Sequence, residues 1–281
     1  MRGTQSPPAD AYNAPMTQIP IFQLHRGDAP LLVSLPHDGT RVPDDIAARL
    51  TPAAARVPDT DWHIARLYDF ARALGASVLV PAYSRYVIDL NRAEDDVSLY
   101  PGQNTTGLCP VVQFDGAPVY RAGAEPDTAE VRARVERYWR PYHAALQDEL
   151  ARLKAAHGRV VLWEGHSIKG DLPFLFEGRL PDLNLGTAGG ASCTPALQAR
   201  LESVLATQAR YGWVANGRFK GGHITRHFGA PAQGIEAVQL ETSQRCYMDE
   251  TSFAWDAARA ASLTPLLQAL LGAALDHARG S

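Results

Sequence analysis

Several polar side chains in this sequence of 281 residues lie directly after apolar runs, in places where they could act together in hydrolytic chemistry. His37 follows "LLVSLP", His166 follows "VVLWEG", and Glu241 ends "EAVQLE". A hydrolytic Zn²⁺ takes three protein ligands from histidine and carboxylate side chains and leaves one position for water. A separate carboxylate can act as general base. These residues, with the acidic stretch "DTD" (59–61), therefore indicate a candidate metal-dependent hydrolase.

The segment "SRYVIDLNR" (84–92) combines an apolar, strand-like pattern with charged and amide side chains. Its apolar residues are typical of a half-buried strand, and we expect one over 86–90. Burying unpaired charge costs several kcal/mol, so the polar residues need partners. They are Arg85, Asp89, Asn91 and Arg92. An arginine at a strand end can also hold an anionic substrate.

Each of these residues also has an ordinary structural explanation. Asp59 or Asp61 could cap a helix, and the arginines could form ion pairs with neighbouring acidic residues. A lone histidine such as His37 is more often a surface residue, and Glu241 could lie exposed at a strand end. The combination favours a site, because four predicted strands deliver such residues to their ends. We interpret the remaining candidates as structural, namely His25, His63, His143 and His157.

Alternating strands and helices predict one α/β domain with a central mixed, mostly parallel sheet flanked by helices. The expected strands are 30–36, 77–81, 86–90, 159–167 and 235–241. The expected helices are 59–75, 127–156, 196–209 and 254–275, the last interrupted or kinked near Pro265. The stretch 100–110 is expected to form a long loop, and loops of this kind are often functional.

The composition and net charge of the sequence narrow the kind of protein this is and the kind of partner it binds. Residues 1–19 are rich in Pro and Ala and are expected to form a flexible leader, with Met16 as an alternative start, before a single domain over 20–281. A net charge of −3 gives no reason to expect binding to nucleic acid. No run of apolar residues approaches the ~18 residues that a membrane span needs. The three widely spaced cysteines favour reduced thiols in a cytoplasmic protein. We expect a small-molecule partner; oligomeric state is not indicated.

Six short motifs carry a resemblance to a known family. They are "LPHDG", "DTDW", "SRYVIDLNR", "WEGHS", "FKGGHITRHFG" and "QLETSQRCYMDE". Their order and context resemble those of N-formylglutamate amidohydrolases, from about residue 20 to about residue 275. That family is distantly similar to the zinc carboxypeptidases, so the resemblance implies a carboxypeptidase-like fold. It also implies hydrolysis of N-formyl-L-glutamate to L-glutamate and formate, the last step of a route of histidine degradation.

The resemblance also implies the metal ligands His37, Asp61 and His166. The carboxypeptidases place a glutamate three residues after the first histidine, where this sequence has Thr40, so Asp61 is the substitute ligand. Asp59 and Asp38 remain alternatives for that ligand. The expected metal is Zn²⁺, with Co²⁺, Fe²⁺ or Mn²⁺ as alternatives, because nitrogen and oxygen ligands suit all four.

The remaining residues take roles around this metal. Asp89 would accept the free ring N–H of His37 and fix its tautomer, while Glu241 would act as general base. Asn91 and Arg92 would bind a substrate carboxylate. Because N-formylglutamate has two carboxylates, a second cation is expected, and the candidates are Arg85 and Arg226, with Lys220 weaker. The neutral Asn216 is a further, weaker candidate for binding the substrate. The pair Gly221–Gly222 fits either a close approach to ligand or a hairpin turn.

Two other functions fit the same residues. One is a related zinc amidohydrolase that acts on another N-acyl acidic amino acid, such as an acylaspartate or acylglutamate, or on a peptide C-terminus. The other is a non-catalytic protein that binds acidic ligands. The presence of His37, His166 and Glu241 together disfavours the second, because a binding protein needs no general base.

Overall fold

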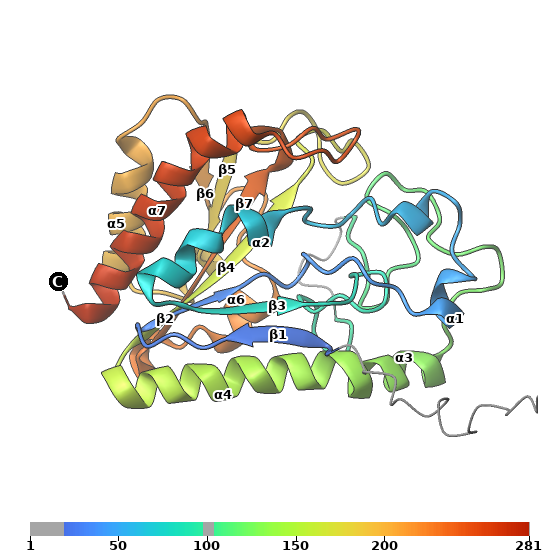
Figure 1. The fold of residues 1–281 in the computed structure, drawn as a ribbon, viewed down its shortest axis with the longest axis horizontal. Helices are drawn as coiled ribbons and strands as arrows, with labels where there is room; N and C mark the ends of the chain where they lie inside the picture. Colours follow the sequence, from blue (N-terminus) through green and yellow to red (C-terminus); the bar gives the residue numbers. More distant parts are fainter. Residues whose placement is uncertain (1–19, 98–103, 281) are drawn as a thin grey trace, which may run out of the picture.

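The computed structural model describes residues 20–97 and 104–280, and within them seven strands form one sheet (Figure 1). The strand order is β1-β3-β2-β4-β7-β5-β6. The strands are β1 (Phe22–His25), β2 (Leu31–Ser34), β3 (Ser77–Pro81), β4 (Val160–Ile168), β5 (Leu183–Gly186), β6 (Trp213–Ala215) and β7 (Ile235–Ser243). The four central strands β3, β2, β4 and β7 are parallel, whereas β1 and β5 pair antiparallel with β3 and β7. The expected single α/β domain with a mixed, mostly parallel sheet is confirmed.

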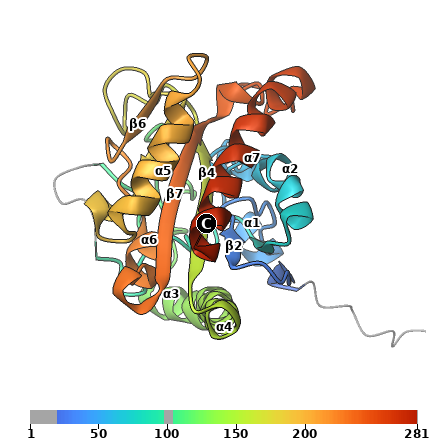
Figure 2. The ribbon, with the colours of Figure 1, turned by 90° about the vertical axis from the view of Figure 1, so that its left-hand side faces the viewer.

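Helices cover both faces of this sheet (Figures 1 and 2). The α-helices are α1 (Asp44–Ala47), α2 (Ile64–Leu67), α3 (Thr128–Arg134), α4 (Arg140–His157), α5 (Pro195–Ala206), α6 (His223–Phe228) and α7 (Ala257–Arg279). Short 3-10 helices span Ala54–Arg56, Asp69–Leu74, Ala188–Gly190, Pro231–Gln233 and Gln244–Cys246. Apolar side chains of α2, α5 and α7 pack on one face, and those of α4 and α6 pack on the other. The sheet is therefore buried on both sides, as its apolar strands predict.

The expected helix over 127–156 is confirmed as one helical segment built from three parts. Between α3 and α4 it contains a π-helical turn, Val135–Trp139. The segment begins where the Asp127 carboxylate accepts from the backbone N–H of Glu130, and it ends at Gly158, whose φ is +77°. Both are the end signals that the sequence carries, an acidic N-cap and a glycine in the left-handed region.

Helix α7 spans Ala257–Arg279 without interruption, so of the two expectations near Pro265 the interruption is wrong and the kink stays a prediction. Pro265 lies on the exposed side of the helix, where solvent can bond the carbonyl group that its missing N–H leaves unpaired. By length and composition α7 could cross a membrane, and a core helix meets the same criterion. Its leucines at 263, 267, 270 and 271 are buried against the sheet and α5, which identifies it as a core helix.

The strand expected over 86–90 is wrong. Residues 84–91 are buried but irregular, and the N–H of Asp89 donates to the carbonyl of Leu108 over 2.7 Å instead of to a neighbouring strand. Polar side chains replace a strand ladder here, because Arg134 donates to Val87 O over 2.9 Å and Asp89 Oδ1 accepts from Asn91 N over 2.9 Å. The apolar residues are buried as the pattern predicts, but in turns.

The helix expected over 59–75 is also largely wrong, because α2 has only four residues and begins at Ile64. Asp59 and Asp61 precede it in a turn, in which the N–H of Asp61 donates to His37 O over 3.0 Å. A 3-10 helix, Asp69–Leu74, follows and ends at Gly75 as expected. The acidic residues therefore join the loop after β2 instead of capping a helix. The leader over 1–19 and residues 100–103 of the expected long loop lie outside the described residues; residues 104–110 are irregular.

His143 on α4 gives the fold a predictable sensitivity to acid. Its Nε2 donates to Leu90 O over 2.9 Å, and burial lowers the pKa of His143 to about 3. Below pH 6.5 the unfolded chain binds a proton at this residue that the folded chain does not, so stability falls as pH falls. We expect His143 to contribute a loss of about 2 kcal/mol between pH 7 and pH 5.

Urea unfolding of the wild type and of His143→Gln over this pH range would measure this loss. Glutamine keeps a donor for Leu90 O but does not titrate, so the free energy of unfolding of the variant should depend less steeply on pH. Parallel pH profiles for the two proteins would contradict the prediction.

Candidate active site

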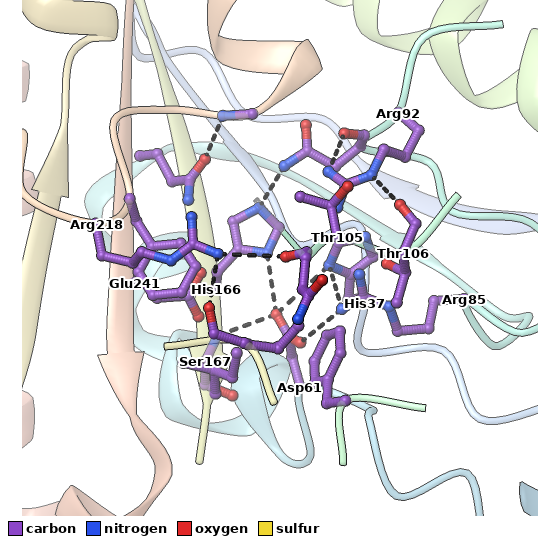
Figure 3. A pocket seen from close by; sticks show the side chains of 18 residues that line it. His37, Asp61, Arg85, Arg92, Thr105, Thr106, His166, Ser167, Arg218 and Glu241 are labelled. Atoms are coloured by element: carbon purple, nitrogen blue, oxygen red, sulfur yellow. Dashed lines mark hydrogen bonds and ion pairs between the residues drawn. The ribbon is translucent and has the colours of Figure 1, made fainter. Parts of the chain in front are cut away.

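His37 and His166, from separate parts of the chain, meet beside Asp61 (Figure 3). His37 follows β2, His166 lies in β4, and these strands are neighbours in the sheet, so the two rings lie 4.8 Å apart between centroids. Asp61 Oδ2 lies 3.0 Å from His166 Nδ1 and 3.9 Å from His37 Nδ1. The backbone N–H of Ser167 also donates to Asp61 Oδ2 over 3.0 Å, which holds the carboxylate in place. The three buried side chains form a group that could hold a metal ion.

A carboxylate lies against the other ring nitrogen of each histidine. His37 Nε2 donates to Asp89 Oδ1 over 2.7 Å, and His166 Nε2 donates to Glu164 Oε1 over 2.7 Å. Arg85 can only donate and lies 3.4 Å from His37 Nδ1, so this nitrogen carries no proton and its lone pair faces Arg85, while Asp61 Oδ2 lies 3.9 Å away. A carboxylate on one ring nitrogen, with the other ring nitrogen next to a possible third ligand, is typical of metal-ligating histidines.

The electrostatics of this group favour a cation. Burial alone would lower the pKa of His166, but Glu164 and Asp61 raise it well above 6.5. Burial alone would likewise raise the pKa of Asp61, but the contacts with His166 and the charge of His37 keep it below its ordinary value. The same negative field that holds a proton on His166 would attract a divalent metal in its place. The donor set therefore fits a metal.

The two alternative carboxylate ligands have other partners. Asp59 Oδ2 accepts from the Tyr86 hydroxyl over 2.7 Å and from the N–H of Phe114 over 2.9 Å. Asp38 Oδ1 accepts from the N–H of Ala65 over 2.9 Å, and burial raises the pKa of Asp38 to about 6. The geometry therefore favours Asp61 as the third ligand.

Glu241 lies beside the histidine–aspartate group. In the pairing of β4 with β7, Glu241 is opposite His166, and its side chain lines the same pocket. Only 6% of Glu241 is exposed, and burial raises the pKa of its carboxyl to about 8. A carboxylate with a raised proton affinity next to a metal group suits a general base.

Glu164 is a site residue that the sequence analysis missed. It precedes His166 by two positions in β4, so both side chains lie on the same face of the strand, and this spacing is the signal that could have identified it. Its Oε2 accepts from the backbone N–H of Thr225 over 3.1 Å and from the Thr225 hydroxyl. Helix α6 therefore supports His166 through Glu164.

The pocket above this group has a volume of about 660 Å³, including space open to solvent. Arg92 lines it and is held by a hydrogen bond from Nε to Thr106 O over 2.9 Å. Arg85 also lines it, but its guanidinium lies 2.5 Å from Asp89 and 4.0 Å from Asp61, which neutralise it. Arg218, which the sequence analysis did not select, is a further lining cation.

Three of the expected substrate-binding residues do not line this pocket. Asn216 instead holds a loop, with its Oδ1 accepting from Thr187 N over 2.9 Å. Arg226 Nε donates to Gly221 O over 2.9 Å, and Lys220 is exposed. The sequence places all three near the site, but their side chains are used elsewhere.

The pair Gly221–Gly222 does not form a hairpin turn. Gly222 directly precedes α6. A Cβ atom at Gly222 would lie 2.3 Å from Asn91 Nδ2, so only glycine allows this approach. The close approach is to Asn91, whose Oδ1 accepts from the N–H of Ile224 over 2.9 Å, so the expected approach to a ligand stays a prediction.

Replacing Asp89 with asparagine is expected to weaken metal binding by roughly 10- to 100-fold, because the variant loses the carboxylate that orients His37. The measurement is a competition titration with a coloured chelator on folded protein. Asp59→Asn is the matched control, since Asp59 is also buried but bonds to Tyr86 and Phe114. Equal metal affinity in Asp89→Asn and wild type would remove this role of Asp89.

Comparisons with known proteins show the family and the fold of this chain. The sequence model of the family described as N-formylglutamate amidohydrolase matches residues 29–248. The N-formylglutamate deformylase of Pseudomonas aeruginosa PAO1 is 52% identical over 260 residues, covering 92% of this chain and 97% of the relative. The N-formylglutamate deformylase of Pseudomonas putida is 51% identical over 256 residues, covering 89% of this chain and 96% of the relative.

Two solved structures share the fold of this chain. The crystal structure of N-formylglutamate amidohydrolase from Ralstonia eutropha JMP134 has a TM-score of 0.77 at 27% identity, covering 93% of this chain and 98% of that chain. An Agrobacterium tumefaciens gene product has a TM-score of 0.69 at 18% identity, covering 92% of this chain and 95% of that chain, and shares the fold. From the family match and these relatives, we conclude that this chain belongs to the N-formylglutamate amidohydrolase family.

Proposed function

We propose that this protein hydrolyses N-formyl-L-glutamate to L-glutamate and formate with the help of a divalent metal. The observation that carries the proposal is the position of Glu241 opposite His166 in the pairing of β4 with β7, beside Asp61 and His37. Two curated relatives at 52% and 51% identity are named N-formylglutamate deformylase, which supports the substrate.

His37 and His166, through their Nδ1 atoms, and the Asp61 carboxylate would hold the metal. When bound, a divalent metal acts as a Lewis acid that polarises a carbonyl oxygen and lowers the pKa of water. Two histidines and a carboxylate are a common ligand set of catalytic Zn²⁺, and this supports Zn²⁺ first. Co²⁺, Fe²⁺ and Mn²⁺ accept the same ligand types.

The side chains of the pocket would carry out the proton transfers and hold the substrate. The Glu241 carboxylate takes a proton from the water that attacks the formyl carbon, and then gives it to the amine nitrogen as the C–N bond breaks. Arg92, next to Asn91, binds a substrate carboxylate with its planar guanidinium. Asp89 and Glu164 keep the two histidine rings in one orientation throughout.

The test is a formate-release assay combined with elemental analysis. We expect about one divalent metal per chain, release of formate from N-formyl-L-glutamate, loss of this activity after chelation, and recovery on adding Zn²⁺. N-formylaspartate, N-acetylglutamate and N-succinylglutamate complete the panel. Equal or faster turnover of one of these would overturn the substrate, and full activity in metal-free protein would overturn the metal dependence.

We also propose a cytoplasmic location, with a small acidic N-acyl amino acid as partner and a role in histidine breakdown. Cys109, Cys193 and Cys246 are buried and unpaired with each other, which supports a reducing compartment. Burial raises the pKa of the Cys109 thiol to about 11, so it is a poor nucleophile at neutral pH.

A further inference from the structure

Arg218 is a cation on the pocket wall for which the chemistry above has no role (Figure 3). We propose that Arg218 determines specificity by binding the side-chain carboxylate of the substrate, while Arg92 binds the α-carboxylate. The inference rests on the proposed function and deepens it, because it states how an acidic side chain is distinguished from a neutral one.

The loop that carries Arg218 is anchored at both ends. At its start the N–H of Asn216 donates to Leu185 O over 2.7 Å, and the Asn216 carboxamide bonds to Thr187. At its end the N–H of Gly222 donates to Gln239 Oε1 over 2.7 Å. Between these anchors the Phe219 ring packs edge-on against Phe176, with centroids 6.4 Å apart. Such support holds a binding side chain in place before the ligand arrives.

Two other segments position the guanidinium itself. Arg218 Nη2 donates to Leu175 O over 3.1 Å and to Asn104 O over 3.4 Å. Asn104 and Leu175 both line the pocket, so the guanidinium is tied to two parts of its wall. In Figure 3, Arg218 and Arg92 lie on opposite sides of His166. A substrate between them would have one cation at each end.

The two carboxylates of the proposed substrate call for two positively charged side chains in the pocket. Arg85 is neutralised by Asp89 and Asp61, so it does not supply a free positive charge for substrate. N-formylglutamate has two carboxylates, and a buried carboxylate without a partner is costly. Arg92 and Arg218 match these two anionic groups in number and in their placement across the pocket.

The positions of Arg92 and Arg218 indicate which of the two substrate carboxylates each arginine would bind. Arg92 follows Asn91, whose Nδ2 lies 3.0 Å from His166 Nε2, so Arg92 is fixed relative to the metal ligands. The α-carboxylate is attached to the carbon that bears the scissile nitrogen, and it must therefore lie near the reacting group. The other carboxylate is at the far end of the substrate side chain, which leaves it for Arg218.

The experiment compares N-formyl-L-glutamate with N-formyl-L-glutamine, in which a neutral amide replaces only the side-chain carboxylate. In Arg218→Gln we expect kcat/KM for N-formylglutamate to fall by roughly 10- to 100-fold, mainly through KM, and kcat/KM for N-formylglutamine to change little. Arg92→Gln should lower both values, because both substrates keep the α-carboxylate. Arg218→Lys, which keeps the charge, should recover part of the preference for N-formylglutamate.

Lys220→Gln is the matched control, because it removes a cation from the same loop at an exposed position outside the pocket lining. It should leave both substrates unaffected. Equal losses on both substrates in Arg218→Gln, or no loss on either, would overturn the assignment. Circular dichroism and thermal melting would show whether each variant is folded.

A binding experiment distinguishes failure of the Arg218 assignment from failure of the proposed function. Calorimetry with L-glutamate and L-glutamine, on the metal-loaded wild type and on Arg218→Gln, compares the same two side chains without turnover. If the wild type hydrolyses neither formyl substrate, the proposed function fails. The assignment of Arg218 then stands if its loss removes the preference for L-glutamate, and it falls if the preference is absent or unchanged.

Discussion

Glu241→Gln is expected to lower kcat for N-formylglutamate by roughly 10²- to 10⁴-fold, the usual contribution of a general base. Glutamine has nearly the same shape as glutamate but cannot accept the proton of the attacking water. Glu241 lies beside the metal group without belonging to it, so metal content should remain that of the wild type. KM should change much less than kcat, because the lost interaction belongs to the transition state.

Steady-state kinetics with elemental analysis of the same samples tests this expectation. Glu236→Gln is the control, because Glu236 is a second buried glutamate of β7 and bonds to Thr194 and His277, away from the pocket. That variant should lose stability but keep its kcat. A kcat within about tenfold of wild type in Glu241→Gln would assign the proton transfer to another group.

His166→Ala is expected to abolish metal retention and, with it, activity. A ligand lost from a three-residue group should weaken metal binding by more than the roughly 10- to 100-fold cost of losing a supporting carboxylate. The substitution also leaves Glu164 buried without its partner over 2.7 Å, so the free energy of unfolding should fall by about 3–5 kcal/mol. Both losses have one cause, the removal of an imidazole held between two carboxylates.

Metal content after gel filtration, turnover with added Zn²⁺, and urea unfolding measure these effects separately. Glu164→Gln offers an intermediate case, because it keeps the imidazole and removes only the charge behind it. We expect it to bind metal more weakly than wild type and more strongly than His166→Ala. Retention of a full metal complement by His166→Ala would exclude His166 as a ligand.

Much of the fold could be predicted from the sequence, because apolar runs and helix end signals are local. The predicted runs at 30–36, 77–81, 159–167 and 235–241 correspond to the four parallel central strands, with ends that differ by up to two residues. The segment 84–92 could not be predicted, since its apolar pattern is that of a strand. Its actual form depends on contacts from Leu108 and Arg134, which are distant in the chain.

Candidate site residues could be selected from the sequence where they lie at the end of a predicted strand, as for His37, His166 and Glu241. It was not predictable where the outcome depends on the direction of a side chain on a loop. Asn216, Arg218 and Arg226 belong to one short stretch, but only Arg218 lines the pocket. Asn216 anchors the loop instead, and Arg226 on α6 donates to Gly221 O just before that helix.

The pairing of β2 with β4 has a consequence for the order of assembly. His37 and His166 come together only when these two parallel strands are paired, and the chain between them must first fold across the sheet. Parallel pairing between distant parts of a chain is slow, because its entropy cost precedes its contacts. The His37–Asp61–His166 group is therefore assembled only once the central strands have joined, and before that point the chain lacks the group that could hold a metal ion.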